Sequence, residues 1–340
     1  MQKAAYFMIT SFGILAMLII GKQILIPLIF AFLIWLLMRE IKLIIDRNNF
    51  IKTKIPNWLK YLFITLLFFT TTFFLANIVI QNMLNLSKAL QIYYPQLKEY
   101  LAKMSQYFNV DLSQIFLNHL NKINFGEWIS RVISSLSNIL GTAIIVLFYV
   151  IFIFLESSHF SSKITKAFSK NNASGKIFSV LKEIEGSIMH YIGLKTLTSF
   201  ITGILSYFAL SIIGVEYAPF WAFLIFILNF IPNIGSIVAT LFPTIYSLLQ
   251  YGDMFHILSV LIILSAIQIV IGNFIEPKWM GDSLNISALV TIIALIFWGA
   301  IWGVVGMILS VPITVIIVNI CSKFPETKAL AVMLSDKGKI

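Results

Sequence analysis

Residues 217–251 form a run of more than thirty residues without a charged side chain. A bilayer core is ~30 Å thick, and a helix of about 20 apolar residues suffices to cross it. The run is therefore too long for one span, and Pro232, Gly235 and Pro243 interrupt it. Backbone groups freed by such residues are tolerated at membrane depth only inside protein or beside a cavity. Because broken helices form the binding sites of secondary transporters, the pattern predicts a polytopic membrane transporter.

The composition predicts the same class of protein. Of the 340 residues, 59% are hydrophobic and 11% are charged, whereas about 25% of the residues in a soluble domain are charged. The net charge of +10 arises from Lys and Arg in short loops beside apolar runs, as the positive-inside rule requires, and this argues against nucleic-acid binding. One cysteine, Cys321, excludes a disulfide within one chain and offers no metal-ligand cluster. We expect neither a metal nor a cofactor.

Eight apolar runs predict an all-α membrane protein with about eight membrane segments, two of them broken or re-entrant. The runs are 4–20, 23–38, 59–80, 136–155, 196–215, 218–250, 254–275 and 286–320. The first two form either a tight hairpin or one element, with the bend at Pro27. The expected regions are N-terminal membrane segments at 1–155, a cytoplasmic loop and amphipathic helix at 156–195, a core of broken helices at 196–320 and a tail at 321–340.

Basic residues predict the orientation of the chain. Segment 39–60 carries six Lys and Arg, 156–195 carries six and the tail 321–340 carries four, whereas the 55 residues of 81–135 carry five. The positive-inside rule therefore places both termini in the cytoplasm and 81–135 outside. Eight crossings satisfy this arrangement, and so do re-entrant hairpins at 218–250 and 286–320. The two models differ in the side on which the loop 276–285 lies.

Two amphipathic segments lie outside the apolar runs. In 81–135, apolar residues at helical spacing predict helices on the outer membrane surface: Leu97, Leu101, Met104 and Phe108. In 175–195, one apolar face predicts a cytoplasmic helix that leads into the span from 196: Ile177, Leu181, Ile184, Ile188 and Ile192. This second helix has either a purely structural role or a role in gating.

The first group of polar residues inside the apolar runs surrounds Pro232. Asn229 and Asn233 are four residues apart, and Gly235 and Ser236 follow. Amide groups cost free energy in hydrocarbon unless they are hydrogen bonded. The group therefore either faces a substrate path or bonds to backbone groups that the proline leaves free.

A second polar group consists of Gln268, Gly272 and Glu276, spaced by four, with Asn273 beside them. This spacing places an amide and a carboxylate on one helix face. The helix is expected to end after Glu276, where Lys278 is available as an ion-pair partner. The face either lines a substrate or ion path, or Glu276 is solvated at the membrane boundary, where an ion pair contributes little.

The last apolar run carries Gly299, Gly303 and Gly306, followed by Pro312. Gly299 and Gly303 form a GxxxG face, which permits close helix packing. The run is also over-long and interrupted, like 218–250, and paired interruptions mark transport sites built from internal repeats. The glycines therefore serve packing alone or form a second part of a transport site.

No enzyme motif is present in the sequence, whether a GxSxG elbow, an HExxH pair, a P-loop or a Rossmann glycine pattern. The four histidines show no ligand spacing. Without a P-loop, uphill transport requires an ion gradient or a separate partner.

Three ordered segments resemble the autoinducer-2 exporter family of PerM-type permeases: IGVEYAPFWAFLIFILNFIPNIGS (213–236), GNFIEPKWMGDSLNISALV (272–290) and FWGAIWGVVGMILSVPITVII (297–317). The resemblance implies a bacterial inner-membrane permease with cytoplasmic termini that forms homo-oligomers in the lipid bilayer. The positions that match the family's motifs are Pro232 and Gly235, Glu276 and Pro277, Gly299, Gly303 and Gly306, and Pro312. Asn233 departs from the bulky residue of many relatives and leaves the substrate open.

Two transport functions follow from the resemblance. Some members are associated with export of autoinducer-2, a small furanosyl signal, and others resemble sodium/proton or lithium/proton antiporters. The uncharged polar groups favour export of a small polar organic solute. Antiport usually needs an intramembrane carboxylate, but acidic residues stand only at the borders of the runs: Glu216, Asp253, Glu276 and Asp282. Antiport is the alternative, and a non-transporting membrane scaffold is a third reading.

Overall fold

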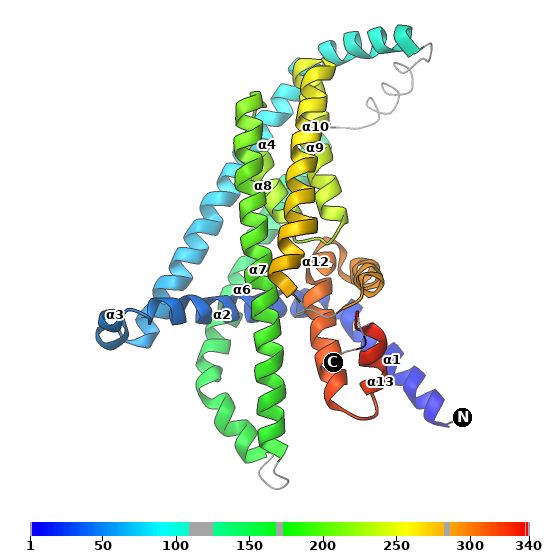
Figure 1. The fold of residues 1–340 in the computed structure, drawn as a ribbon. Coiled ribbons are helices and arrows are strands. Elements are labelled where there is room, and N and C mark those ends of the chain that lie inside the picture. Colours follow the sequence, from blue (N-terminus) through cyan, green and yellow to red (C-terminus); the bar gives the residue numbers. More distant parts are fainter. Residues whose placement is uncertain (1, 109–124, 168–172, 282–285, 337, 339–340) are drawn as a thin grey trace. The chain divides into compact units, whose positions relative to one another are not determined.

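The structure is a computed structural model that describes residues 2–108, 125–167, 173–281, 286–336 and 338. Within these ranges the chain is helical and contains no strand, which confirms the all-α class (Figure 1). The elements are α1 (Gln2–Ile20), α2 (Lys22–Ile45), α3 (Asn49–Lys54), α4 (Asn57–Phe108), α6 (Phe125–Ala167), α7 (Ala173–Ile213), α8 (Ala218–Leu228), α9 (Ile234–Tyr251), α10 (Met254–Ile269), the π-helix η2 (Val270–Ile275), α11 (Glu276–Met280), α12 (Ala288–Lys323) and α13 (Lys328–Leu334).

Six helical segments in the described ranges are long and apolar enough to cross a membrane, judged by length and composition. They are Lys22–Ile45, Asn57–Leu86, Phe178–Ile213, Ile234–Tyr251, Met254–Met280 and Ala288–Lys323. Shorter apolar helical segments lie at Met8–Ile20, Gly141–Ser157 and Ala218–Leu228. The chain is therefore a polytopic helical membrane protein, as its composition predicts.

The first two apolar runs form one bent element rather than a tight hairpin. In Figure 1, α2 continues from α1 with a change of direction. The break falls at Gly21, whose amide donates to the Met17 carbonyl at 2.8 Å. A Cβ at Gly21 would lie 2.6 Å from that carbonyl oxygen, so the bend needs a residue without a side chain. The bend was expected at Pro27, but that residue lies inside α2.

Helices α4, α6 and α7 contain 52, 43 and 41 residues. Because about 20 residues cross the hydrocarbon core, each of them continues well beyond its apolar segment. Helix α7 contains both the segment 175–195 and the span from 196; Ile188 is buried and Lys182 is exposed. The described part of 81–135 is helical, but residues 109–124 and the side chains of Leu97, Leu101, Met104 and Phe108 lie outside the description.

The chain divides into two compact units, and unit 1 contains residues 1–66, 141–194 and 280–340. Helix α2 contributes to several of its core clusters. Leu36 packs in one cluster with Ile188 of α7 and Val315 of α12. Met38 packs in another cluster with Val150 of α6. The apolar face of 175–195 is therefore used for packing within this unit.

The end of α2 is joined to the start of α4 by a carboxylate between two lysines. Asp46 Oδ1 lies 2.6 Å from Lys60 Nζ, and Asp46 Oδ2 lies 2.9 Å from Lys42 Nζ. Lys60 is buried although it is charged. The hydrogen bonds from Lys60 and Lys42 hold the pKa of the Asp46 carboxyl below its usual value.

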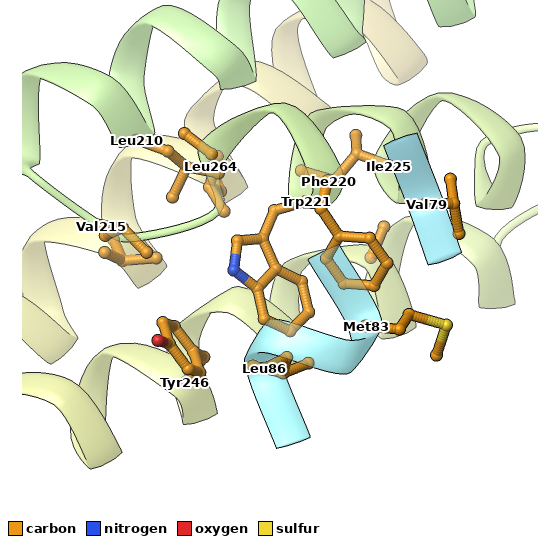
Figure 2. Close-up of a cluster of buried hydrophobic side chains, with 13 residues drawn as sticks. Val79, Met83, Leu86, Leu210, Val215, Phe220, Trp221, Ile225, Tyr246 and Leu264 are labelled. Carbon is orange, nitrogen blue, oxygen red and sulfur yellow. The ribbon is translucent and has the colours of Figure 1, made fainter. Parts of the chain in front are cut away.

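Unit 2 contains residues 67–140 and 195–279. Figure 2 shows its hydrophobic cluster, in which Trp221 of α8 lies beside Leu86 of α4 and near Tyr246 of α9. The ring centroids of Trp221 and Tyr246 are 5.4 Å apart. The indole Nε1 also donates to the Glu216 carbonyl at 3.2 Å. These contacts fix the first turns of α8, and with them the chain that leads to Pro232.

Candidate functional site

The long apolar run 218–250 is broken at residues 229–233. Helix α8 has 11 residues and is therefore about 16 Å long, about half of the hydrocarbon thickness. Helix α9 begins after Asn233, whose backbone has φ 59° and ψ −57°. This positive φ is uncommon for a residue other than glycine. The break lies at Pro232, as the sequence predicts, whereas Pro243 lies inside α9 without ending it.

Gly235 makes the close approach of α8 and α9 possible. A Cβ at this position would lie 1.8 Å from the Leu228 carbonyl oxygen. Every other residue type would therefore force the two helix ends apart. At the same place, Ser236 Oγ donates to the Asn233 carbonyl at 2.8 Å, which satisfies a backbone group next to the break.

A polar face of α7 lies beside the break, and the interpretation of the sequence missed it. The face consists of Lys195, Thr198, Ser199, Thr202 and Ser206, all of which are buried. The other four follow Lys195 by three, four, seven and eleven residues, a spacing that places all five on one side of a helix. Asn229 connects this face to the break, since its Nδ2 donates to Ser199 Oγ at 3.1 Å.

Ser206 and Ser247 stand out within unit 2. Each hydroxyl is buried and has no hydrogen-bond partner in the described part of the chain. By contrast, the Thr202 hydroxyl donates to the Thr198 carbonyl at 2.8 Å. A buried hydroxyl without a partner costs free energy, so each one calls for an explanation such as a bound solute or water.

Glu276 forms an ion pair at the other end of the α7 face. Its Oε1 lies 2.6 Å from Lys195 Nζ, and the exposed fractions of the two side chains are 15% and 8%. The Thr198 hydroxyl donates to Glu276 Oε2 at 3.4 Å. The expectation of a solvated boundary residue paired with Lys278 was wrong, because Lys278 is exposed and the partner comes from α7.

The π-helix η2 immediately precedes Glu276. The Glu276 amide donates to the Ile271 carbonyl, five residues earlier. The helix does not end there, because α11 follows directly. Pro277 has no amide hydrogen and its ring crowds the preceding turn, which accounts for the wider winding. Single π turns are frequent at functional sites. This one shifts Glu276 around the helix axis relative to its position in a regular α-helix.

The sequence spacing of four was expected to place Gln268, Gly272 and Glu276 on one helix face. The wider turn of η2 disturbs this alignment. Gln268 is half-buried on α10, Gly272 is half-buried in η2, and Asn273 is exposed. No hydrogen bond within the described ranges joins Gln268 or Asn273 to the residues of the break. The structure thus connects Asn229 and Glu276 through α7, and leaves the two intervening amides apart from that network.

The last apolar run turns sharply at Gly303. This residue has φ 63° and ψ −143° inside the span assigned to α12, a conformation outside the helical range. A Cβ at Gly306 would lie 1.9 Å from the Trp298 carbonyl oxygen, although eight residues of a straight helix span about 12 Å. Gly299 faces Met307 of the opposite limb, and Pro312 is buried in the second limb. Gly299, Gly303 and Gly306 therefore permit a sharp turn whose two sides pack closely.

The other acidic residues at the borders of the runs have local partners. Glu216 Oε2 accepts a hydrogen bond from the Tyr246 hydroxyl at 2.9 Å. Asp253 caps α10 by accepting from the His256 amide at 2.8 Å, and this backbone hydrogen bond lowers the pKa of the Asp253 carboxyl. Asp282 lies outside the described residues. Among the described acidic residues at the borders of the apolar runs, Glu276 is thus the one that pairs with a buried lysine.

Known proteins match most of the chain. The sequence pattern of the AI-2E family transporter matches residues 7–326. A protein of Borreliella burgdorferi, provisionally named as a transport protein, is 37% identical over 73% of this chain and 68% of its own length. A Haemophilus influenzae protein with the same provisional name is 30% identical over 83% of both chains. The AI-2 transport protein TqsA of Escherichia coli is 33% identical over 70% of this chain and 69% of its own length.

Proposed function

This chain belongs to the AI-2E transporter family, and from that premise we propose that it exports a small polar organic solute along the buried polar face of α7 in unit 2. The observation that carries the proposal is the hydroxyl of Ser206 on that face, which is buried and has no hydrogen-bond partner within the part of the chain that the structure describes. The face adjoins a broken helix, and such breaks form the binding sites of secondary transporters.

The chemistry of the face suits a neutral solute with several hydroxyl groups. Asn229 and the serine and threonine hydroxyls carry no charge, so they can bind hydroxyl groups without holding an ion. Hydroxyls that donate to the backbone, as Thr202 does, keep lone pairs that accept hydrogen bonds. TqsA is named for transport of AI-2, and we propose a solute of this kind as the substrate.

We also propose an orientation of the chain in the membrane, which follows from the positive-inside rule. We place the protein in the bacterial inner membrane, with both termini in the cytoplasm and 81–135 outside. We also propose that it works as a homo-oligomer.

The test is flux of AI-2 from proteoliposomes that contain the purified protein, with Ser206→Ala as the decisive variant. Because the Ser206 hydroxyl has no hydrogen-bond partner among the described residues, its removal should leave folding intact. Loss of one hydrogen bond to the solute should raise KM for AI-2 about fivefold. Ser211→Ala, an exposed position on the same helix, is the matched control and should transport as the unsubstituted protein does. Unchanged KM in Ser206→Ala would remove this face from the path.

A sodium(lithium)/proton antiporter is the second candidate, and the half-buried Glu276 favours it. An antiporter needs a carboxylate within the membrane, and we propose that Glu276, which is paired with Lys195, serves as this group. The assay is decay of an imposed proton gradient after addition of sodium or lithium. Antiport predicts that the Lys195→Met, Glu276→Gln double variant abolishes this decay. Solute export without cation exchange predicts no cation-driven decay in either protein.

A further inference from the structure

Ser247 of α9 is a buried polar residue that the path along α7 does not explain. The residue has an exposed fraction of 0%, and its hydroxyl has no hydrogen-bond partner among the residues that the structure describes. A serine in a helix ordinarily donates to a carbonyl of the preceding turn, as Ser236 does to Asn233. A fully buried hydroxyl that does not do so calls for a ligand or a water molecule.

Ser247 is the last member of a stripe of hydroxyl groups on α9, whose other members are Ser236, Thr240 and Thr244. Steps of four, four and three residues place all four on one side of the helix. Thr240 donates to the Ser236 carbonyl at 2.9 Å, and Thr244 donates to the Thr240 carbonyl at 2.8 Å. Both threonines are buried, and their hydroxyls keep lone pairs that can accept hydrogen bonds. The α9 hydroxyl stripe therefore offers two acceptors beside the unused hydroxyl of Ser247.

A different side of α9 packs in the hydrophobic cluster of unit 2. Ala239 and Tyr246 belong to that cluster, and at 3.6 residues per turn they lie about 80–100° around the helix axis from Ser247. The α9 hydroxyl stripe is therefore a second buried face of the helix. Pro243 lies between the two threonines and Ser247 in this part of α9. Because proline has no amide hydrogen, the Ala239 carbonyl lacks the donor that a regular helix would supply, which adds another acceptor to this stretch.

The α9 hydroxyl stripe and the polar face of α7 extend between the same two places in unit 2. At the break, Asn229 bonds to Ser199 of α7, and Ser236 begins the stripe. At the other end, the Tyr251 hydroxyl donates at 2.7 Å to the carbonyl of Gly214, the residue that follows α7. The last turn of α9 is thus joined to the end of α7.

Ser206 and Ser247 lie at successive levels before this shared end. Ser206 precedes Ile213, the last residue of α7, by seven residues, or about 10 Å along the helix. Ser247 precedes Tyr251, the last residue of α9, by four residues, or about 6 Å. A solute that leaves Ser206 towards the shared end would therefore reach the level of Ser247 next.

We propose that Ser247 is a second binding residue for the transported solute, which rests on the proposed function of the α7 face. A hydroxyl of the solute bonds to Ser247, and the lone pairs of Thr244 accept from a neighbouring hydroxyl. An apolar solute would leave these groups unpaired. An ion would meet no opposite charge on α9, because residues 217–251 contain no charged side chain. The site therefore selects a neutral solute with several hydroxyl groups.

The first test asks whether polar molecules reach Ser247, and it needs no transport substrate. Cys321 is the sole cysteine of the chain, so Ser247→Cys and Ala239→Cys in a Cys321→Ser background each carry one thiol. Both positions have an exposed fraction of 0%, but Ala239 packs in the hydrophobic cluster. A small charged methanethiosulfonate reagent, which reacts with the hydrated thiolate, should modify Ser247→Cys and leave Ala239→Cys unmodified. Equal modification of the two thiols, or none at Ser247→Cys, would overturn the proposal.

The second test measures AI-2 flux from proteoliposomes that contain Ser247→Ala. Loss of one hydrogen bond to the solute should raise KM about fivefold, while the thermal unfolding midpoint should not fall, since the hydroxyl has no partner among the described residues. Ser211→Ala remains the control. A raised KM in Ser206→Ala with an unchanged KM in Ser247→Ala would overturn this inference alone. An unchanged KM in both variants would also remove the path along α7.

Discussion

Loss of one partner of the ion pair between Lys195 and Glu276 should destabilise unit 2 strongly. Its two side chains are largely shielded from solvent and their charged atoms are 2.6 Å apart. Removing one partner leaves the other charge buried without compensation, which typically costs about 3–5 kcal/mol. Removing both charges avoids this penalty. We therefore expect Glu276→Gln and Lys195→Met each to lower the free energy of unfolding by about 3–5 kcal/mol, and the double variant to lose much less than their sum.

The measurement is equilibrium unfolding in mixed micelles of dodecyl maltoside and sodium dodecyl sulfate, followed by circular dichroism. The pair Lys163–Glu156 is the matched control, because its side chains are 63% and 55% exposed. Exposed pairs contribute little, so Lys163→Met and Glu156→Gln should leave the unfolding midpoint unchanged. Additive effects of the Lys195 and Glu276 substitutions would refute the reasoning, and so would losses no larger than those of the control pair.

Three further outcomes are expected. Gly235→Ala should destabilise the protein by about 3 kcal/mol or more, because its Cβ would lie 1.8 Å from a backbone carbonyl oxygen. Gly272→Ala is the control, since a Cβ there meets open space, and thermal unfolding of the two variants compares them. Gly303→Ala should cost about 1–3 kcal/mol in the same assay, since the positive φ of this turn strains any side chain. Asp46 has a lowered pKa, so the stability that it contributes is present above pH 3.8 and is lost as the pH falls through its folded pKa. As the pH is lowered from 6 to 3, the thermal midpoint of Asp46→Asn should therefore fall less steeply than that of the unsubstituted protein. Equal slopes would contradict the role of this carboxyl.

The local breaks were predictable from the sequence because their causes are local. Pro232 and Gly235 stand within a few residues of the break that they produce, and Gly303 stands at the turn itself. The change of direction at Gly21 was misplaced at Pro27, because an interior proline usually kinks a helix, whereas α2 continues through Pro27.

The site was less predictable, because its contacts join distant segments. Lys195 and Glu276 are 81 residues apart, and Asn229 and Ser199 are 30 apart. A single sequence offers Lys278 as the nearest partner and cannot reveal the distant one. The polar face of α7 was visible as a helical spacing of Lys195, Thr198 and Thr202 in the sequence. It was overlooked because serine and threonine are easily accommodated in membrane helices by bonding to the backbone.

The separation between Lys195 and Glu276 also has a consequence for synthesis of the chain. The hairpin at Gly235 closes between residues only seven apart, so it can form soon after both limbs have left the ribosome. The ion pair of Lys195 can form only after 81 further residues have been synthesised, which takes about 4–16 s at ordinary rates of translation. Throughout this interval α7 carries a lysine whose carboxylate does not yet exist.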